Sequence, residues 1–134
     1  MPIISCTGRD GIVRGFEYRT IRDETEGQWL FKVTTIPAPK SGDFFELCVC
    51  EHGESRVRIV MANHFHKTEY AAMGIPEALL PAVKIELGRI VESSPGQGPV
   101  GDVYRTDSAT KYWERLCQIG GATYDPSTDI YTVA

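Results

Sequence analysis

The sequence has no long hydrophobic run, no recognisable export signal and few cysteines. No segment approaches the roughly 18 apolar residues that a membrane span requires, so no membrane association is expected. The first six residues, Met1 to Cys6, lack the basic and apolar regions of a secretion signal. Four cysteines in 134 residues are too few for a disulfide framework and are expected to be reduced. These absences predict a cytoplasmic protein.

Positive charge is also scarce. The chain carries 14 lysines and arginines against 18 acidic residues, which gives a net charge of -4. The arginines alternate with acids along the chain and do not gather in one segment. Nucleic-acid binding depends on basic side chains that neutralise phosphates, so nucleic acid is not an expected partner.

The remaining composition is that of an average globular domain. Hydrophobic residues make up 42% of the chain and charged residues 24%. A chain of 134 residues can bury a core without metal or disulfide support. No internal repeat or linker divides it, so a single domain over residues 1–134 is expected.

The first half of the chain has the pattern of β-strands. Apolar and polar side chains alternate, and β-branched and aromatic residues are frequent, in four segments: 16–21, 29–36, 44–51 and 56–62. Short polar or proline- and glycine-rich turns separate them. Four successive strands joined by turns predict an antiparallel sheet.

The second half changes to a helical period. After Gly74, apolar residues recur at every fourth position and form one stripe of an amphipathic helix: Ile75, Leu79, Val83 and Leu87. Pro76 and Glu77 suit its first turn. Pro81 removes a helical hydrogen bond, so a kink or a restart is expected there.

A fifth strand is predicted at 89–93, followed by a loop at 94–102, a second helix from about Ser108, and a hairpin at 122–133. The buried stripe of that helix is expected to contain Ala109, Tyr112, Trp113 and Leu116. The predicted fold class is α+β: a mostly antiparallel sheet of five or more strands, with two helices after the fourth strand and a C-terminal β-hairpin.

Metal binding is a weak candidate. Cys48, Cys50 and His52 alternate and should share one sheet face, and His64 and His66 should do the same on the next strand. However, alternate strand residues lie about 7 Å apart, too far to share one ion without a bend, and buried cysteines usually act as small hydrophobic residues. No metal site is therefore predicted.

Other chemistries have less support. No serine lies in a Gly-x-Ser-x-Gly pattern. With Met1 removed, Pro2 would resemble the N-terminal base of the tautomerase family, but that family has a helix directly after its first strand, and residues 8–11 here lead to more strand. The second helix with the hairpin could form a winged helix, but the acidic hairpin residues Asp125 and Asp129 oppose DNA.

From about Trp29 onward, the order of elements and two motifs resemble the GNAT family of N-acetyltransferases. The first motif, Gly74-Ile75-Pro76-Glu77-Ala78-Leu79-Leu80, is similar to the family's pyrophosphate loop. The resemblance implies acetyl-CoA as cofactor, held by backbone amides at the start of a helix. It maps the cofactor-binding residues to Ala72, Met73, Gly74 and Ile75.

The second motif is the segment 108–116, which resembles the family's late helix. A tyrosine there serves as general acid for the departing thiolate, and the resemblance maps this catalytic role to Tyr112. Three features depart from the family. Ala71 and Pro76 replace residues of the loop pattern, and the first strand and two helices of the family have no counterpart before Phe16.

Two functions are therefore expected as alternatives. The first is an acyl-CoA-dependent N-acyltransferase that acts on a small-molecule or peptide amine. It requires the strand at 56–62 to separate from the strand at 89–93 and leave a V-shaped opening at Gly74 for the pantetheine arm. The second is a non-catalytic ligand- or protein-binding module, for which a homodimer is one form. Aromatic residues spread over the sheet motivate this alternative: Tyr18, Trp29, Phe31, Phe44 and Phe45.

Overall fold

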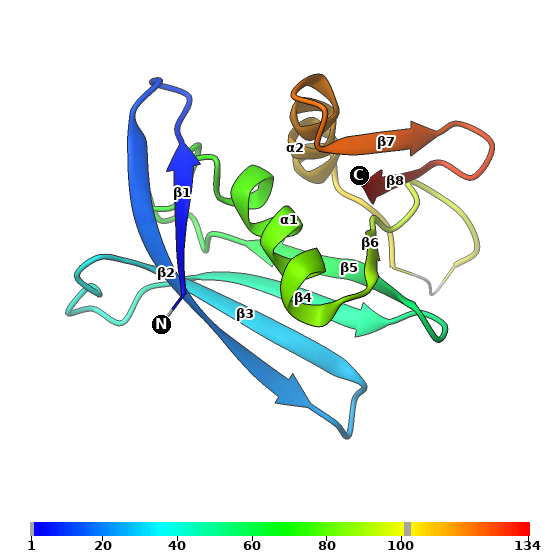
Figure 1. The fold of residues 1–134 in the computed structure, drawn as a ribbon, viewed down its shortest axis with the longest axis horizontal. Coiled ribbons are helices and arrows are strands. Elements are labelled where there is room, and N and C mark those ends of the chain that lie inside the picture. Colours follow the sequence, from blue (N-terminus) through cyan, green and yellow to red (C-terminus); the bar gives the residue numbers. More distant parts are fainter. Residues whose placement is uncertain (1, 101–102) are drawn as a thin grey trace.

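The computed structural model describes residues 2–100 and 103–134. Within them the chain forms eight strands and two helices, shown in Figure 1. In chain order these are β1 (Ile3–Thr7), β2 (Val13–Asp23), β3 (Gln28–Thr35), β4 (Phe45–Glu51), β5 (Arg56–Asn63), α1 (Ile75–Leu87), β6 (Ile90–Glu92), α2 (Asp107–Gln118), β7 (Ala122–Asp125) and β8 (Ile130–Val133).

All strands belong to one curved sheet with the order β1-β2-β3-β4-β5-β6-β8-β7. Neighbouring strands are antiparallel except β5 and β6, which are parallel because α1 connects them. Helix α1 lies between β1 and α2, as Figure 1 shows. The predicted α+β class, the mostly antiparallel sheet and the C-terminal hairpin are confirmed.

The prediction that the helices follow the fourth strand is wrong, since they follow the fifth. The additional strand is β1, which pairs with β2 at the edge of the sheet. Its side chains alternate, with Ile4 and Cys6 buried and Ile3 exposed. Residues 2–23 therefore form a hairpin of two strands.

Helix α1 is continuous through Pro81, so it does not restart there. Gly74 precedes it and Gly88 follows it, both with left-handed backbone angles. Four side chains of α1 are buried: Ile75, Leu79, Leu80 and Val83. Burial of these side chains stabilises the helix by more than the loss of one hydrogen bond at Pro81 destabilises it.

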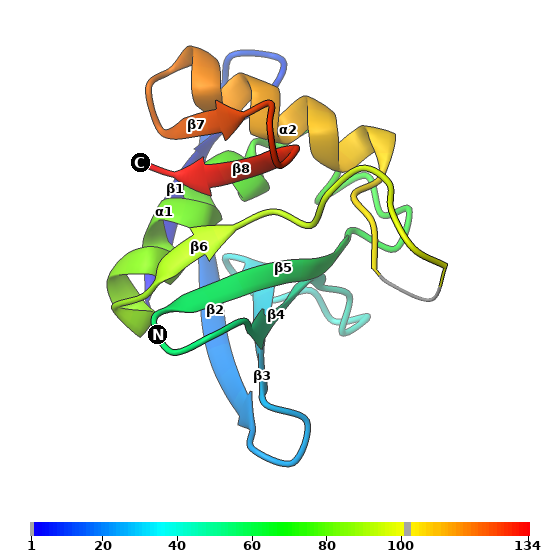
Figure 2. The same ribbon diagram turned by 90° about the vertical axis from the view of Figure 1, so that its right-hand side faces the viewer.

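Strands β5 and β6 separate soon after they meet. They pair over only three residues, from Arg56 opposite Ile90 to Arg58 opposite Glu92. Strand β6 then ends, whereas β5 continues to Asn63, as Figure 2 shows. On its other side, β5 pairs with β4 through a bulge: Ile59 faces Val49 and Met61 faces Cys48, which leaves Val60 as the extra residue. A bulge bends its strand, which is consistent with the separation.

Helix α2 packs on the C-terminal hairpin. Thr106 caps it by accepting a hydrogen bond from the amide of Ala109. Its predicted stripe is largely confirmed, because Tyr112, Trp113 and Leu116 are buried and Ala109 is partly buried against the core. Trp113 stacks on Tyr131 of β8 with ring centroids 5.8 Å apart. The helix and the hairpin thus form one wall beside the open part of β5.

None of the helices in the described residues is long and apolar enough to cross a membrane.

Replacing Gly74 by alanine is expected to destabilise the protein by about 2–4 kcal/mol. Alanine is strained in the left-handed backbone conformation of this position, and its Cβ atom would overlap the backbone of Thr7. A Cβ atom at this position, where φ is +77°, would lie 2.2 Å from the carbonyl oxygen of Thr7. The measurement is urea unfolding. Gly53→Ala is the matched control, because Gly53 also has a positive φ but has open space around it. A Gly74→Ala variant no less stable than Gly53→Ala would contradict the close approach to Thr7.

Candidate functional site

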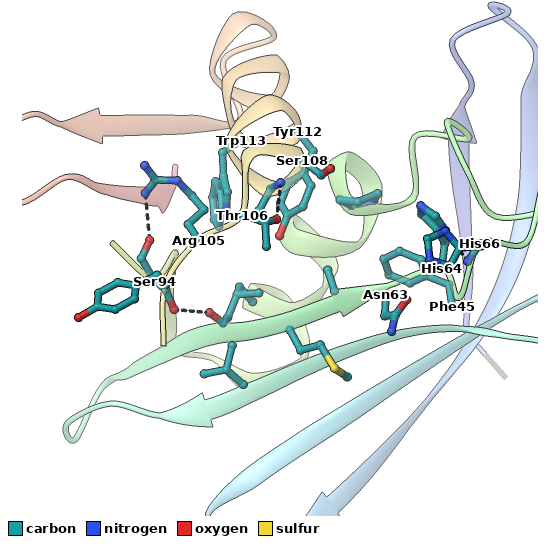
Figure 3. Close-up of a pocket in the computed structure, with 17 residues that line it drawn as sticks. Phe45, Asn63, His64, His66, Ser94, Arg105, Thr106, Ser108, Tyr112 and Trp113 are labelled. Atoms are coloured by element: carbon teal, nitrogen blue, oxygen red, sulfur yellow. Dashed lines mark hydrogen bonds between the residues drawn. The ribbon is translucent and has the colours of Figure 1, made fainter. Parts of the chain in front are cut away.

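A cavity of about 370 Å³ lies between β5 and α2, and we call it the β5–α2 cavity. Its lining comes from the free part of β5, the segments on either side of it and the buried face of α2, as Figure 3 shows. The side chains labelled there are Phe45, Asn63, His64, His66, Ser94, Arg105, Thr106, Ser108, Tyr112 and Trp113. The two strands separate as expected, but Gly74, where the opening is predicted, is not among the residues that line this cavity.

The edge of β5 forms one side of this cavity. Beyond Arg58, no strand among the described residues pairs with β5 on the side of β6. The Ser94 hydroxyl donates a hydrogen bond of 2.8 Å to the carbonyl oxygen of Ile59 and so covers the first open position. The edge from Val60 to Asn63 presents backbone groups to the cavity, and such groups require a partner. An extended ligand with amide groups can supply one.

Tyr112 lines the cavity from α2 and is 6% exposed. Figure 3 shows its side chain pointing from the helix toward β5. Its hydroxyl makes no hydrogen bond within residues 2–100 and 103–134. Burial raises the pKa of Tyr112, and the nearby Glu77 carboxylate raises it further, against the opposing effect of Arg105. The phenol therefore stays protonated at neutral pH, and the same shift makes it a weaker acid than an exposed tyrosine.

Glu77 lies in the first turn of α1, where the helix dipole favours a negative charge. One of its carboxylate oxygens, Oε1, accepts a hydrogen bond of 2.8 Å from Nε of Arg115 on α2. The other, Oε2, is buried without a hydrogen-bond partner among the described residues. The ion pair between Glu77 and Arg115 thus links α1 to α2.

Arg105 anchors the segment that leads into α2. Its side chain is 7% exposed and forms an ion pair of 2.9 Å with Asp129 on the β7–β8 turn. It also donates to the carbonyl oxygens of Ser94 and Asp129 and to the hydroxyl of Thr110. These bonds tie the end of the β6 segment, the hairpin and α2 together, so they hold the wall opposite β5 in place.

His64 and His66 lie at the far end of the cavity from Ser94 and Arg105, as Figure 3 shows. The prediction that both lie on a strand is wrong, because β5 ends at Asn63. The Asn63 side chain accepts a hydrogen bond from the amide of Phe65, which turns the chain. The amide of His66 then donates to Nδ1 of His64 at 2.9 Å, and the backbone of His66 is left-handed with φ of 58°.

The cysteines of the predicted sheet face do not form a ligand set with these histidines. Cys48 donates a hydrogen bond of 2.8 Å to the side-chain oxygen of Gln28. Burial raises the pKa of the Cys48 thiol to about 12, so it is not a ready thiolate. In the described part of the chain, no three His, Cys, Asp or Glu side chains are grouped in a way that could hold a metal ion.

The residues predicted to bind the cofactor lie at the start of α1, beside the β1–β2 turn. The carbonyl oxygen of Ala72 accepts a hydrogen bond of 2.9 Å from the amide of Arg9. Gly74 packs against Thr7 and lines a separate cavity of about 460 Å³. Ala72, Met73 and Ile75 are not among the residues that line the β5–α2 cavity, whereas Pro76 is.

Of the residues that line the cavity, the sequence identified Tyr112 as a candidate site residue but did not identify Ser94 or Arg105. Ser94 begins the loop predicted at 94–102, whose length was a signal of function, and Arg105 lies shortly after it. Neither residue belongs to a spacing pattern, because Ile59 lies 35 positions from Ser94 and Asp129 lies 24 positions from Arg105. Only the folded chain brings them together.

Comparison of the chain with protein-family models, with curated proteins and with solved structures gives no match. The function must therefore be argued from the geometry of the chain itself.

Replacing Asp129 by asparagine is expected to destabilise the protein in a pH-dependent way. Hydrogen bonds from Arg105, Tyr124 and Gly96 lower the pKa of Asp129 from 3.8 to about 2. A lowered pKa means that the ionised form stabilises the fold above pH 3.8, and that this contribution disappears as the pH falls toward 2. The difference in urea midpoint between the wild type and Asp129→Asn should be full at pH 6 and shrink below pH 4.

Glu24→Gln is the control for the loss of one exposed carboxylate, because Glu24 forms no ion pair among the described residues. A difference for Asp129→Asn that stays constant between pH 6 and pH 2.5 would contradict the role of its charge.

Proposed function

We propose that the chain is a GNAT-like N-acyltransferase that uses acetyl-CoA and acts on a small-molecule or peptide amine. The observation that carries the proposal is the edge of β5 from Val60 to Asn63, which has no strand partner on this side within the described residues and faces Tyr112 across one cavity. The amide groups of a pantetheine arm match the requirements of such an edge, because they are spaced along an extended chain and both donate and accept hydrogen bonds.

The order of elements supports the same proposal. From β5 onward the chain runs strand, helix, parallel strand, helix and hairpin, with a cavity where the parallel strands separate. This arrangement resembles the second half of the GNAT fold. The first half differs, since the described residues before α1 form strands and no helix.

The two ends of the cavity differ in chemistry. His64 and His66 lie at one end, near the start of α1, and we assign this end to the phosphates of the cofactor. Ser94 and Arg105 lie at the other end, where β5 and β6 separate, and we assign this end to the acetyl group. Tyr112 projects between the two ends, within reach of an extended ligand.

In this proposal, acetyl-CoA supplies an activated acetyl group. When the cofactor is bound, the amine would displace its sulfur from the acetyl carbon, and Tyr112 would give its phenolic proton to that sulfur. The proton lost by the amine restores the phenol through solvent, so atoms and charge balance. Tyr112 holds this proton at neutral pH before the step, and its raised pKa lowers the driving force for the transfer.

A second candidate is a non-catalytic module that binds another extended ligand in the same cavity. The packing of Gly74 against the backbone of Thr7 favours it, because this contact covers part of the helix start that would receive the phosphates. Pro76 also has no amide hydrogen to donate there. Binding without turnover would identify this candidate.

Filling the cavity is expected to weaken cofactor binding. Ala109 lines the cavity from α2, so Ala109→Phe places a ring where the pantetheine arm would lie. Isothermal titration with acetyl-CoA should show at least tenfold weaker binding, about 1.4 kcal/mol, than in the wild type. Glu114→Phe, on the exposed face of the same helix, is the control and should bind as the wild type does. The proposal fails if the wild type does not bind acetyl-CoA.

Removing the hydroxyl group of Tyr112 is expected to slow turnover without weakening the binding of acetyl-CoA. Tyr112→Phe should lower kcat by about 10²-fold or more and leave the Kd for acetyl-CoA within threefold. The assay is release of free thiol from acetyl-CoA with a mixture of amino acids, polyamines and short peptides. An unchanged kcat would remove Tyr112 from the chemistry. Tight binding with no turnover in the wild type would select the non-catalytic candidate.

A further inference from the structure

A second cavity, of about 580 Å³, lies beside the point where β5 and β6 separate, and we call it the arginine pocket. One wall comes from the β4–β5 turn, β5 and β6, and the other from the β7–β8 hairpin. Its lining residues are His52, Arg56, Arg58, Glu92, Pro95, Asp125, Thr128, Ile130 and Thr132. Val57 and Val91 are fully buried in the core, so the alternating residues Arg56, Arg58 and Glu92 point to the opposite face of the sheet.

Glu92 is the centre of this pocket and is 5% exposed. Its Oε1 accepts hydrogen bonds from Nε and Nη2 of Arg58, at 3.2 and 3.0 Å. Its Oε2 accepts one from Nη1 of Arg56 at 3.3 Å. Nε2 of His52 lies 3.7 Å from Oε1. Both carboxylate oxygens thus have partners, and Glu92 acts as a positioning residue that aligns two guanidinium groups.

The two arginines retain donors after pairing with Glu92. A guanidinium carries five N–H groups, and within the described residues Arg56 directs one of them, and Arg58 two, to a hydrogen-bond acceptor. Two positive charges face a single buried carboxylate. The remaining N–H groups form a planar, fork-shaped donor set of the kind that binds a carboxylate or a phosphate in two places.

The hairpin wall adds little competing negative charge inside the pocket. Asp125 is exposed on the rim, and its Oδ1 accepts hydrogen bonds from the amide and the hydroxyl of Ser127, at 2.9 and 2.7 Å. These bonds turn its carboxylate toward its own turn and lower its pKa. Thr132 lies directly opposite Glu92 across the strand pair and offers a hydroxyl.

We propose that the arginine pocket binds the carboxylate or phosphate group of a small molecule. The pocket and the β5–α2 cavity lie on opposite faces of the sheet at the point where the strands separate, since the consecutive residues Arg58 and Ile59 line the first and the second. Glu92, at the end of β6, lines the pocket, and Ser94, two residues later, lines the cavity. Resting on the proposed function, this placement makes the bound molecule the acceptor: an amine that carries an acidic group, held with its nitrogen at the separation of the strands.

The pocket itself is tested without acetyl-CoA. Succinate and inorganic phosphate are titrated separately into the protein at low ionic strength, with binding followed by calorimetry. At least one should bind saturably, and which one binds distinguishes a carboxylate from a phosphate ligand. Arg56→Gln should weaken that binding at least tenfold. This variant keeps the fold, because Arg56 is about half exposed and Arg58 still pairs with Glu92.

Arg19→Gln is the matched control, since it removes one exposed arginine outside the pocket, on β2. It should change the affinity by less than twofold. The proposal is overturned if neither anion binds saturably, if Arg56→Gln binds as the wild type does, or if Arg19→Gln weakens binding as much as Arg56→Gln.

The acceptor role is tested by turnover. Each amino acid is compared with its amide, which keeps the amine and lacks the carboxylate. Amino acids should be acetylated at least tenfold faster than their amides, and Arg56→Gln should remove this preference. Equal rates would overturn the acceptor role. If acetyl-CoA does not bind at all, the transferase proposal fails. The anion titration then still shows whether the arginine pocket binds a carboxylate or a phosphate.

Discussion

The early end of the parallel pairing between β5 and β6 determines most of what this chain can do. A strand edge inside a protein normally finds a partner, because an unpaired backbone amide or carbonyl that is removed from water destabilises the fold. Here the ladder stops after Arg58, and β5 continues without a strand partner on this side in the part of the chain that the structure describes. The Ser94 hydroxyl donates a hydrogen bond to the carbonyl oxygen of Ile59, the first residue after the ladder ends. The residues from Val60 to Asn63 line a cavity. The β5–α2 cavity and the arginine pocket lie on the two sides of this one interruption.

A free edge remains open only if the opposite wall cannot collapse onto it. Arg105 provides the main restraint, because it binds the segment after β6, the hairpin and α2 at once while it is almost fully buried. The stacking of Trp113 on Tyr131 keeps α2 on the hairpin. The Glu77–Arg115 pair links α2 to α1. The wall that carries Tyr112 is therefore held from three directions, independently of β5.

The sequence predicted the local structure well and the relations between distant segments poorly. Alternation and the step of four from Ile75 to Leu87 identified most strands and α1, because these patterns express burial on one face. Residues 3–7 were missed as a strand because only Ile4 and Cys6 are buried in them. Tyr112 was found through its place in a motif. The surroundings of Glu92 depend on Arg56 and Arg58, more than 30 positions earlier, and on the register of two parallel strands. No local pattern reports such a register.

The extra residue at Val60 ties the lining of the cavity to the length of β5. Side chains of a strand alternate between its two faces, so one additional residue exchanges the faces of every position that follows it. Met61, Ala62 and Asn63 therefore face the sides opposite to those a regular ladder would give them. A relative that lacked this single residue could keep every other amino acid and still present a different surface to its ligand. The set of side chains that line the cavity therefore depends on the number of residues in β5 as well as on their types.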